Sequence, residues 1–267
     1  MARNLKITLA YDGHDFHGWQ VQPGKPTVQS ALAEALARIT GENVLPQGSG
    51  RTDAGVHALA QVASVKIESP IPASGLRTAL NDKLPGTIRV YSVEEAAPVF
   101  HARHSAKGKL YRYRIYRDAI CPPFLAHYVW HYPWPLDEPR MMQAAQEICG
   151  EHDFTSFAAT DPDRAARENG DEPSNVRTVF SSAWRRDGAE LIYEVRGNGF
   201  LHHMVRNLVG TFVEVGKWRH PAEHIARVLE QKSRSAAGET APASGLYLVE
   251  VEYGTHHPFQ RQEHGDE

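Results

Sequence analysis

The loop formed by residues 48–55, called here the Asp53 loop, holds the residues best suited to chemistry. Its sequence GSGRTDAG places one carboxylate, Asp53, between glycines, with Arg51 two residues before it. Glycines let a backbone approach a ligand closely. An aspartate of ordinary pKa is anionic at neutral pH and can act as nucleophile or base, while Arg51 can orient it or bind a phosphate. The alternative is an Asx-turn with a solvated arginine.

Tyrosines and cations alternate along residues 107–117, KGKLYRYRIYR, which we expect to form a strand. An aromatic ring such as Tyr111 can stack on an unpaired base, a contact worth about 1–3 kcal/mol, and neighbouring cations can neutralise phosphates. The alternative places the tyrosines in the core and the arginines in water. Residues 99–117 contain no carboxylate, and their cations are Arg103, Lys107, Lys109, Arg112, Arg114 and Arg117.

A third stretch, residues 197–210 with sequence GNGFLHHMVRNLVG, combines polar groups with the apolar spacing of a helix. The start of a helix suits anions because unpaired N–H groups point outward there. The apolar spacing leaves His202, His203 and Arg206 on other faces. Core packing alone would account for the apolar positions, so Arg206 is the residue whose role most needs an explanation.

Metal and nucleotide motifs are absent from the sequence. The fifteen histidines include the pairs His14/His17, His101/His104 and His202/His203. There is no HExxH motif or cysteine cluster, and adjacent side chains on a helix diverge, so we expect no metal. The Asp53 loop also lacks the GxGxxG and P-loop patterns, which argues against a dinucleotide or ATP site.

The composition excludes several classes of protein. The 267 residues carry a net charge of −3, which argues against a uniformly basic nucleic-acid binder. Two cysteines are too few for a disulfide scaffold and fit a reducing cytoplasm. No signal-peptide core and no run of 18 apolar residues occurs, so we expect a soluble, cytoplasmic protein that does not bind membranes.

Periodicity predicts an α+β fold in two units, residues 1–105 and 106–267. Strands are predicted at 5–11, 63–67, 88–93, 110–116 and 246–251, with a hairpin joining 178–184 to 191–195 through Asp187-Gly188. Helices are predicted at 28–39, 76–84, 139–149, 201–213 and 221–229, the first capped by Thr27 and ended by Gly41.

Three motifs in this order, GRTDAGVHA (50–58), KGKLYRYRIY (107–116) and GFLHHMVRN (199–207), closely resemble the TruA family of tRNA pseudouridine synthases. Shorter matches are YDG (11–13), FHGWQ (16–20), FHAR (100–103) and GEHDF (150–154). The resemblance spans most of the chain. It implies the pseudouridine synthase fold, in which two α/β halves with mostly antiparallel sheets are flanked by helices around a central cleft.

The resemblance also implies function. Members of this family isomerise uridine to pseudouridine in the anticodon stem-loop of tRNA, at positions 38–40, as homodimers without metal or organic cofactor. Asp53 matches the catalytic aspartate and Tyr111 the tyrosine that stacks on the target uracil, while Arg51 and Arg206 match active-site arginines. An Asp can attack C1′, add to C6 or act first as a base, and the sequence leaves these open. The basic residues of 103–114 are expected to contact RNA backbone, and the base must be extruded from its stem.

Two segments differ from the rest of the chain in what we expect of them. Residues 158–176 form a longer and more acidic stretch, which we predict to be a mobile loop away from the RNA, and the tail from Gln260 is predicted to be disordered and inessential. Two other functions remain open: a catalytically inactive RNA-binding protein of the same fold, and a glycoside or nucleoside hydrolase. Most such hydrolases need a second carboxylate, whereas the loop offers Asp53 alone.

Overall fold

Alternating apolar residues produce the strands, as in Arg3–Tyr11, where Leu5, Ile7 and Leu9 are fully buried. The computed structural model describes residues 2–160 and 174–254. Its strands are β1 (Arg3–Tyr11), β2 (Gln47–Gly48), β3 (His57–Ile67), β4 (Ile88–Ala96), β5 (Gly108–Tyr116), β6 (Trp130–His131), β7 (Gly150–Asp153), β8 (Val176–Asp187), β9 (Glu190–Gly197) and β10 (Leu246–Glu252).

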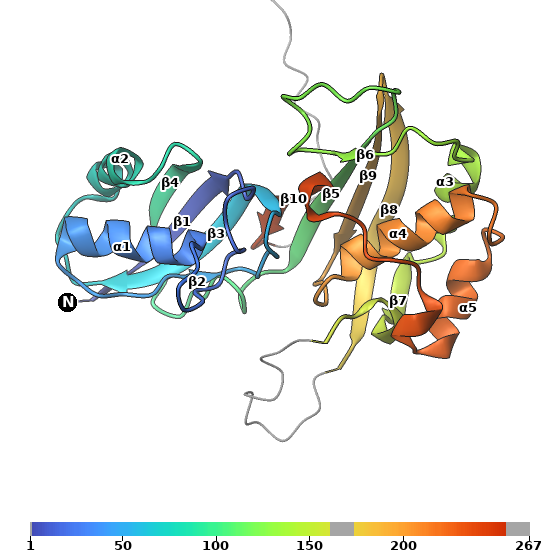
Figure 1. Ribbon diagram of the computed structural model, residues 1–267. Helices are drawn as coiled ribbons and strands as arrows, with labels where there is room; N and C mark the ends of the chain where they lie inside the picture. The colour runs from blue at the N-terminus through green and yellow to red at the C-terminus, as the bar shows by residue number, and fades with distance from the viewer. Residues whose placement is uncertain (1, 161–173, 255–267) are drawn as a thin grey trace, which may run out of the picture.

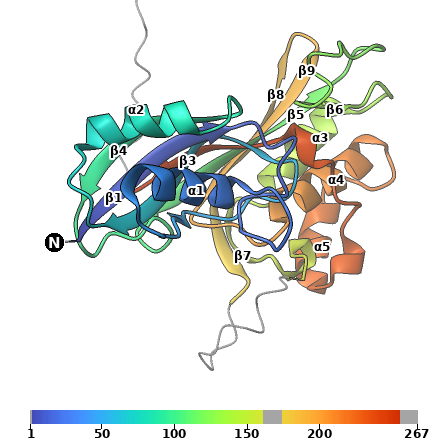
Figure 2. The same cartoon turned by 60° about the vertical axis from the view of Figure 1, so that its left-hand side comes forward.

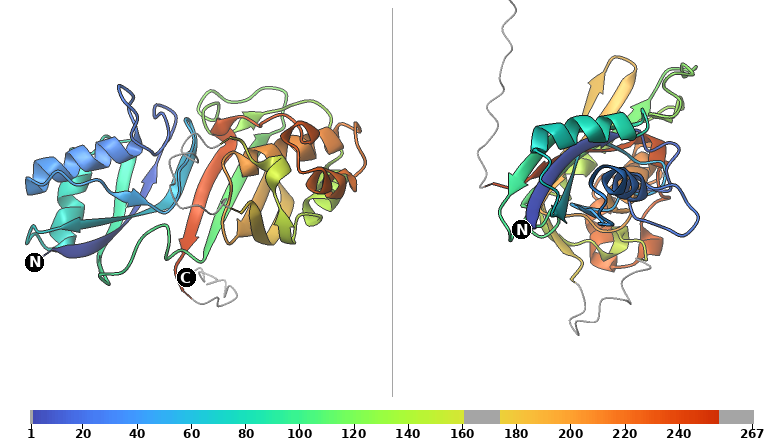
Figure 3. Two further views of the ribbon diagram at one scale, coloured as in Figure 1. Left: turned by 90° about the horizontal axis from the view of Figure 1, so that it is seen from below. Right: turned by 90° about the vertical axis from the view of Figure 1, so that its left-hand side faces the viewer.

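These strands form one sheet in the order β4-β1-β3-β10-β5-β9-β8-β7, with β2 paired to β3 and β6 to β5. Most neighbours are antiparallel, including the predicted β8–β9 hairpin, while β10 runs parallel to β3. Figures 1 and 3 show β10 beside β5 in the middle of the molecule. β10, which comes last in the described sequence, therefore joins the N-terminal strands to the C-terminal strands.

Five helices flank the sheet, and they are α1 (Val28–Thr40), α2 (Ala73–Lys83), α3 (Glu138–Gln146), α4 (Met204–Gly216) and α5 (His224–Gln231). The α1 boundaries confirm the sequence prediction, since Thr27 and Ser30 form a reciprocal capping box and Gly41, at φ 77°, ends the helix. Figures 1 and 2 show α1 and α2 beside the N-terminal strands and the other three helices beside the C-terminal strands. The α+β prediction is confirmed.

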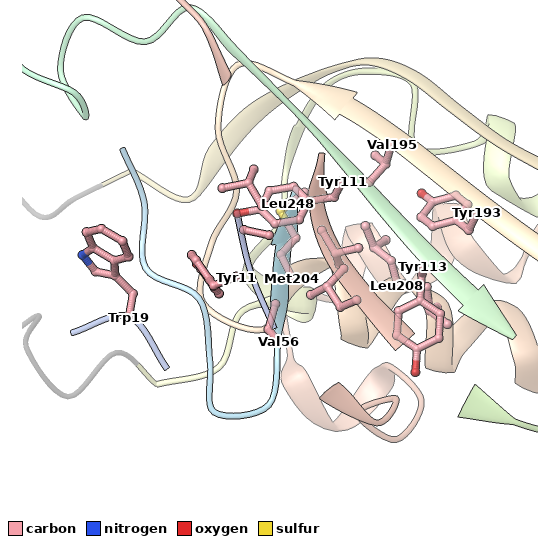
Figure 4. Close-up of a cluster of buried hydrophobic side chains, with 14 of the residues drawn as sticks. Tyr11, Trp19, Val56, Tyr111, Tyr113, Tyr193, Val195, Met204, Leu208 and Leu248 are labelled. Atoms are coloured by element: carbon pink, nitrogen blue, oxygen red, sulfur yellow. The ribbon is translucent and has the colours of Figure 1, made fainter. Parts of the chain in front are cut away.

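One hydrophobic core runs through both parts of the sheet. Figure 4 shows part of it, with Tyr11 and Val56 from the N-terminal side, Leu248 from β10, and Tyr111 and Leu208 from the C-terminal side. Shared burial of these side chains resists separation of the two parts, because apolar area removed from water contributes about 25 cal/mol per Å².

Several expectations fall on segments that the structure leaves undescribed. The acidic residues of 161–173 and the tail from Gln260 lie outside residues 2–160 and 174–254, so the predictions about them stay predictions. Among the described residues, no helix is both long and apolar enough to span a membrane.

Candidate active site

The Asp53 loop lies between β2 and β3 and is held by the backbone of residues 12–19. Trp19 N–H donates to the Thr52 carbonyl at 3.0 Å, and Gly55 N–H donates to the Phe16 carbonyl at 3.2 Å. A Cβ on Gly18 would lie 2.4 Å from the Thr52 carbonyl oxygen. Only glycine permits so close an approach. This contact fixes the height of the loop above the sheet.

A buried polar network supports the same loop from below. The Tyr11 hydroxyl lies 2.8 Å from Thr52 Oγ1, and Gln61 donates to the Gly50 carbonyl at 3.1 Å. The hydroxyl of Ser49 donates to Gln61 Oε1 at 2.6 Å. Burial raises the pKa of Tyr11 to about 12, although its hydrogen bonds to Thr52 and Gln61 oppose this. The tyrosine is therefore neutral, and the network holds the loop without adding charge.

The carboxylate of Asp53 meets the third sequence stretch at the start of α4. Arg206 Nη1 donates to Asp53 Oδ2 at 2.8 Å, across 153 positions of sequence, and Arg206 Nε donates to the Ala241 carbonyl at 2.8 Å. His202 Nε2 lies 3.4 Å from Asp53 Oδ1, and His203 Nε2 lies 3.3 Å from Asp53 Oδ2. The side chain of Asp53 is 19% exposed. It is thus an accessible carboxylate surrounded by cationic or polar nitrogen atoms.

These neighbours decide the charge of Asp53. Burial alone would raise the pKa of its carboxyl group. The hydrogen bond from His202, the charge of His203 and the contact with Arg206 outweigh burial, so the pKa of Asp53 lies below its ordinary value. Burial lowers the pKa of His203 more than Asp53 raises it. Asp53 is therefore ionised at neutral pH and suits a nucleophile or base rather than an acid.

The two histidines were not predicted to meet Asp53. The expected helix began at residue 201, which would turn adjacent side chains apart, but α4 begins at Met204. His203 precedes it with φ 59°, a left-handed conformation, and the rings of His202 and His203 lie 4.0 Å apart. The GNG sequence before this segment was the available signal, since glycines and Asn indicate a turn rather than a helix.

Tyr111 lies on β5 beside the same carboxylate. It is 7% exposed, and its ring contacts Phe200 edge to face with centroids 5.0 Å apart. Burial, with smaller contributions from Tyr11 and from the negative charge of Asp53, raises the pKa of Tyr111 far above its ordinary value. Its hydroxyl is protonated. The structure thus brings Asp53, Arg206 and Tyr111 together from three distant parts of the sequence.

Comparisons with known proteins identify the family of the chain. A family model described as tRNA pseudouridine synthase matches residues 7–105 and 144–254. The chain is 52% identical over 251 residues to tRNA pseudouridine synthase A of Solibacter usitatus, covering 94% of this chain and all of the relative. It is 46% identical over 252 residues to the protein of that name in Moorella thermoacetica, covering 93% and 99%. The chain belongs to the tRNA pseudouridine synthase family. Asp53 and Arg206 both fall within the matched residues.

The predicted RNA contacts of this pseudouridine synthase family member differ in their exposure. Arg51, Arg103 and Lys107 are exposed, and the first two line one shallow hollow together with Gly50, His101 and His104. Arg51 lies on the solvent side of the Asp53 loop, and Arg103 follows the end of the N-terminal strands. These side chains can reach a ligand without rearranging the sheet.

The cations of β5 are engaged within the sheet. Arg112 pairs with Glu194 at 2.6 Å, and Arg114 binds Glu190 through two hydrogen bonds of 2.5 and 2.6 Å. Lys109 Nζ donates to the Ser49 carbonyl at 2.8 Å. Burial, aided by the charges of Arg103 and Arg177, lowers the pKa of Lys109 to about 8. Lys109 thus supports the Asp53 loop from β5.

A second polar cluster, absent from the sequence prediction, anchors the end of the Asp53 loop. His57 is 2% exposed, its Nε2 lies 3.0 Å from the His127 carbonyl oxygen, and Gly13 N–H donates to its Nδ1 at 3.1 Å. The Tyr128 hydroxyl donates a hydrogen bond to Asp12 Oδ2 at 2.7 Å, and Asp12 Oδ1 lies 3.2 Å from His57 Nδ1. Burial lowers the pKa of His57 despite Asp12. This cluster ties β1 and β3 to residues 127–128.

One group of side chains in the described part of the chain has the spacing of metal ligands. Asp53, His202 and His203 each offer a ligand atom, and these atoms lie within 4.8 Å of one another. The sequence prediction of no metal rested on the lack of an HExxH motif, the lack of a cysteine cluster and the divergence of adjacent side chains on a helix. The last of these premises is wrong for His202 and His203, because both precede α4.

Proposed function

We propose that this protein isomerises uridine to pseudouridine in the anticodon stem-loop of tRNA, at positions 38–40, with Asp53 as the catalytic carboxylate. The family match and the names of the relatives support tRNA as the substrate. The observation that carries the proposal is the 2.8 Å contact between Asp53 Oδ2 and Arg206 Nη1, which joins two of the three sequence motifs. Tyr111 of the third motif is close enough that, beyond the effect of burial, the charge of Asp53 helps to raise its pKa, which supports one shared site.

The reaction needs no redox partner. The N1–C1′ bond of uridine breaks, the base rotates, a C5–C1′ bond forms, the hydrogen on C5 leaves as a proton, and N1 takes up a proton. An ionised carboxylate can attack C1′, add to C6 or remove a proton, and the depressed pKa of Asp53 suits all three. Arg206 holds the Oδ2 oxygen of Asp53, while the Oδ1 oxygen lies 3.4 Å from His202 Nε2, so the substrate would approach a carboxylate whose orientation is already fixed.

Tyr111 is proposed to hold the extruded uracil. Flipping a base out of a stem costs a few kcal/mol, and stacking on an aromatic ring returns about 1–3 kcal/mol. The edge-to-face contact with Phe200 fixes the orientation of the Tyr111 ring before substrate arrives. A ring fixed in advance loses little conformational entropy on binding.

Phosphate binding is proposed for Arg51 and for the cations of 103–114. Arg103 and Lys107 are exposed and can contact the RNA backbone directly. Arg112 and Arg114 already pair with Glu194 and Glu190, so only their remaining N–H groups would contact phosphates unless these pairs break. Lys109 would act mainly through its positive charge, because its ammonium group is largely buried and already donates to the Ser49 carbonyl.

The remaining proposals follow the family resemblance. Residues 1–105 and 106–267 would form two units that enclose the RNA, the enzyme would act as a homodimer in the cytoplasm, and it would need neither metal nor organic cofactor. Light scattering of the purified protein tests the dimer, and activity after exhaustive chelation tests the cofactor prediction.

The decisive experiment is tritium release from tRNA containing [5-³H]uridine. Forming the C5–C1′ bond expels that hydrogen, so an isomerase releases tritium to the solvent while the base stays attached to the RNA. Asp53→Asn is the matched control, because it preserves shape and removes the charge. Tritium release that disappears in Asp53→Asn supports the proposal. Binding without release would indicate an inactive RNA-binding protein, and free uracil would indicate a hydrolase.

A further inference from the structure

Asp53, His202 and His203 have the dimensions of a transition-metal site. The two carboxylate–imidazole distances are 3.4 and 3.3 Å. In a tetrahedral zinc site with bonds of about 2.0–2.1 Å, neighbouring ligand atoms lie about 3.3 Å apart. Each imidazole already has this separation from one of the two Asp53 oxygens, and all three ligand atoms lie within 4.8 Å of one another. Small side-chain rotations would therefore bring them onto one ion.

His202 is oriented as metal-binding histidines are. Its Nδ1 lies 3.1 Å from the Thr160 carbonyl oxygen, and its own carbonyl accepts the Ala159 N–H at 3.0 Å. A ring that donates from Nδ1 to a carbonyl presents Nε2 on the opposite side, which here faces Asp53. Donation of the second ring nitrogen to a backbone carbonyl is the usual support for a histidine ligand. If Nε2 of His202 held neither a proton nor a metal ion, its lone pair would face an Asp53 carboxylate oxygen, and the two would repel each other. A bound cation would remove this repulsion.

Solvent can reach these three ligands, whose side chains are 34%, 29% and 19% exposed for His202, His203 and Asp53. Water or a substrate oxygen can therefore complete the coordination of a bound ion. Two imidazoles favour zinc, cobalt, nickel or copper over magnesium and calcium, which prefer oxygen. The positive charge of Arg206, 2.8 Å from Asp53 Oδ2, opposes binding and limits the affinity.

We propose that Asp53, His202 and His203 bind a divalent transition metal, such as Zn²⁺ or Co²⁺, in the RNA-free protein, and that the bound ion inhibits the enzyme. The ion would occupy the carboxylate lone pairs that the reaction requires. It is thus an inhibitor and no cofactor. The inhibition rests on the proposed function, whereas the metal binding does not.

Direct binding is tested first, in the absence of RNA. The full chain is titrated with Co²⁺, whose visible absorption is strong only in tetrahedral or five-coordinate sites, and Zn²⁺ is then added to displace it. The variant His202→Gln/His203→Asn removes two ligands, and Asn at 203 tolerates the left-handed backbone. We expect a Co²⁺ band of one equivalent in the parent protein and at least tenfold weaker binding in the variant. Asp53→Asn is the second variant, in case the first fails to fold.

His220→Gln/His224→Gln is the matched control. These two rings stack almost in parallel, 3.8 Å apart at 9°, so their in-plane lone pairs cannot converge on one ion. Removing them leaves the other histidines unchanged, so the Co²⁺ band should persist. Equal Co²⁺ spectra in the two double variants, or the lack of a tetrahedral band in the parent protein, would overturn the proposal.

Inhibition is measured next, by tritium release with and without Zn²⁺. We expect inhibition that chelation reverses and that His220→Gln/His224→Gln retains. If His202→Gln/His203→Asn keeps measurable activity, Zn²⁺ should inhibit it at least tenfold less; equal inhibition would refute the assigned ligands. Failure of the parent protein to release any tritium would refute the proposed function while leaving the Co²⁺ result intact.

Discussion

Arg206 is the residue whose replacement most directly tests how the site works. Its guanidinium bridges Asp53 Oδ2 and the Ala241 carbonyl, each at 2.8 Å, and its side chain is 15% exposed. Arg206→Gln removes the charge and shortens the side chain. Arg206→Lys keeps the charge but loses the planar pair of donors that spans the two partners.

The expected loss follows from the contact with Asp53. A hydrogen bond to a charged group contributes about 1.5–3 kcal/mol, and about 1.4 kcal/mol corresponds to tenfold in rate. Arg206→Gln should therefore slow the reaction roughly 10- to 150-fold, with Arg206→Lys between it and the parent. Because Arg206 helps to depress the pKa of Asp53, its removal raises that pKa. Asp53 acts when ionised, so the acidic limb of the pH profile should move to higher pH.

Single-turnover tritium release across a range of pH measures both effects. Arg185→Gln is a control of equal charge change, because Arg185 is 49% exposed and pairs with Asp187 at the end of the β8–β9 hairpin. Exposed ion pairs contribute about 0–1 kcal/mol, so this variant should match the parent protein. An Arg206→Gln enzyme with the parent rate and pH profile would refute the assigned role of Arg206.

Four further predictions concern other parts of the site. Asp53→Asn should abolish tritium release and leave tRNA affinity within a few-fold; retained turnover would exclude Asp53 as the catalytic group. Tyr111→Phe keeps the stacking ring, so tRNA affinity should persist in a filter-binding assay, and unchanged kcat would limit its role to the ring. Lys109→Met leaves the Ser49 carbonyl without its donor and should lower the free energy of unfolding by about 1–3 kcal/mol in urea titration; unchanged stability would show that this bond contributes nothing. Binding of tRNA should weaken with salt at a slope of about −0.9 per neutralised phosphate in duplex regions, and a flat response would exclude phosphate contacts by residues 103–114.

Local signals in the sequence were sufficient for most of the longer helices and strands, but the short strands β2, β6 and β7 were not predicted and α4 begins at Met204 instead of residue 201. The alternation of Leu5, Ile7 and Leu9 predicts β1, and Thr27 with Gly41 predicts both ends of α1. Each of these signals lies within a few residues of the element it defines, so no tertiary information was needed. The motif resemblance likewise identified Asp53 and Arg206, which the structure brings into contact.

Long-range features could not be derived from periodicity. The alternation in residues 246–251 predicts a strand, but nothing in it indicates that β10 pairs with both β3 and β5. The positions of His202 and His203 depend on the left-handed turn before α4. Lys109 looked like an RNA-binding cation, and its bond to the Ser49 carbonyl becomes visible only when β5 is placed under the Asp53 loop.

The central position of β10 delays completion of the sheet while the ribosome makes the chain. β10 is synthesised after the other described strands, yet Tyr247 and Leu248 pair with His57 and Ala58 at the start of β3. Protein chains commonly begin to fold from the N-terminal side during synthesis. Until residues 246–252 emerge, this edge of β3 has neither of those partners, and an unpaired strand edge can pair with another chain. Before β10 is made, the nascent chain therefore presents unpaired strand edges on both β3 and β5, the two strands that β10 joins.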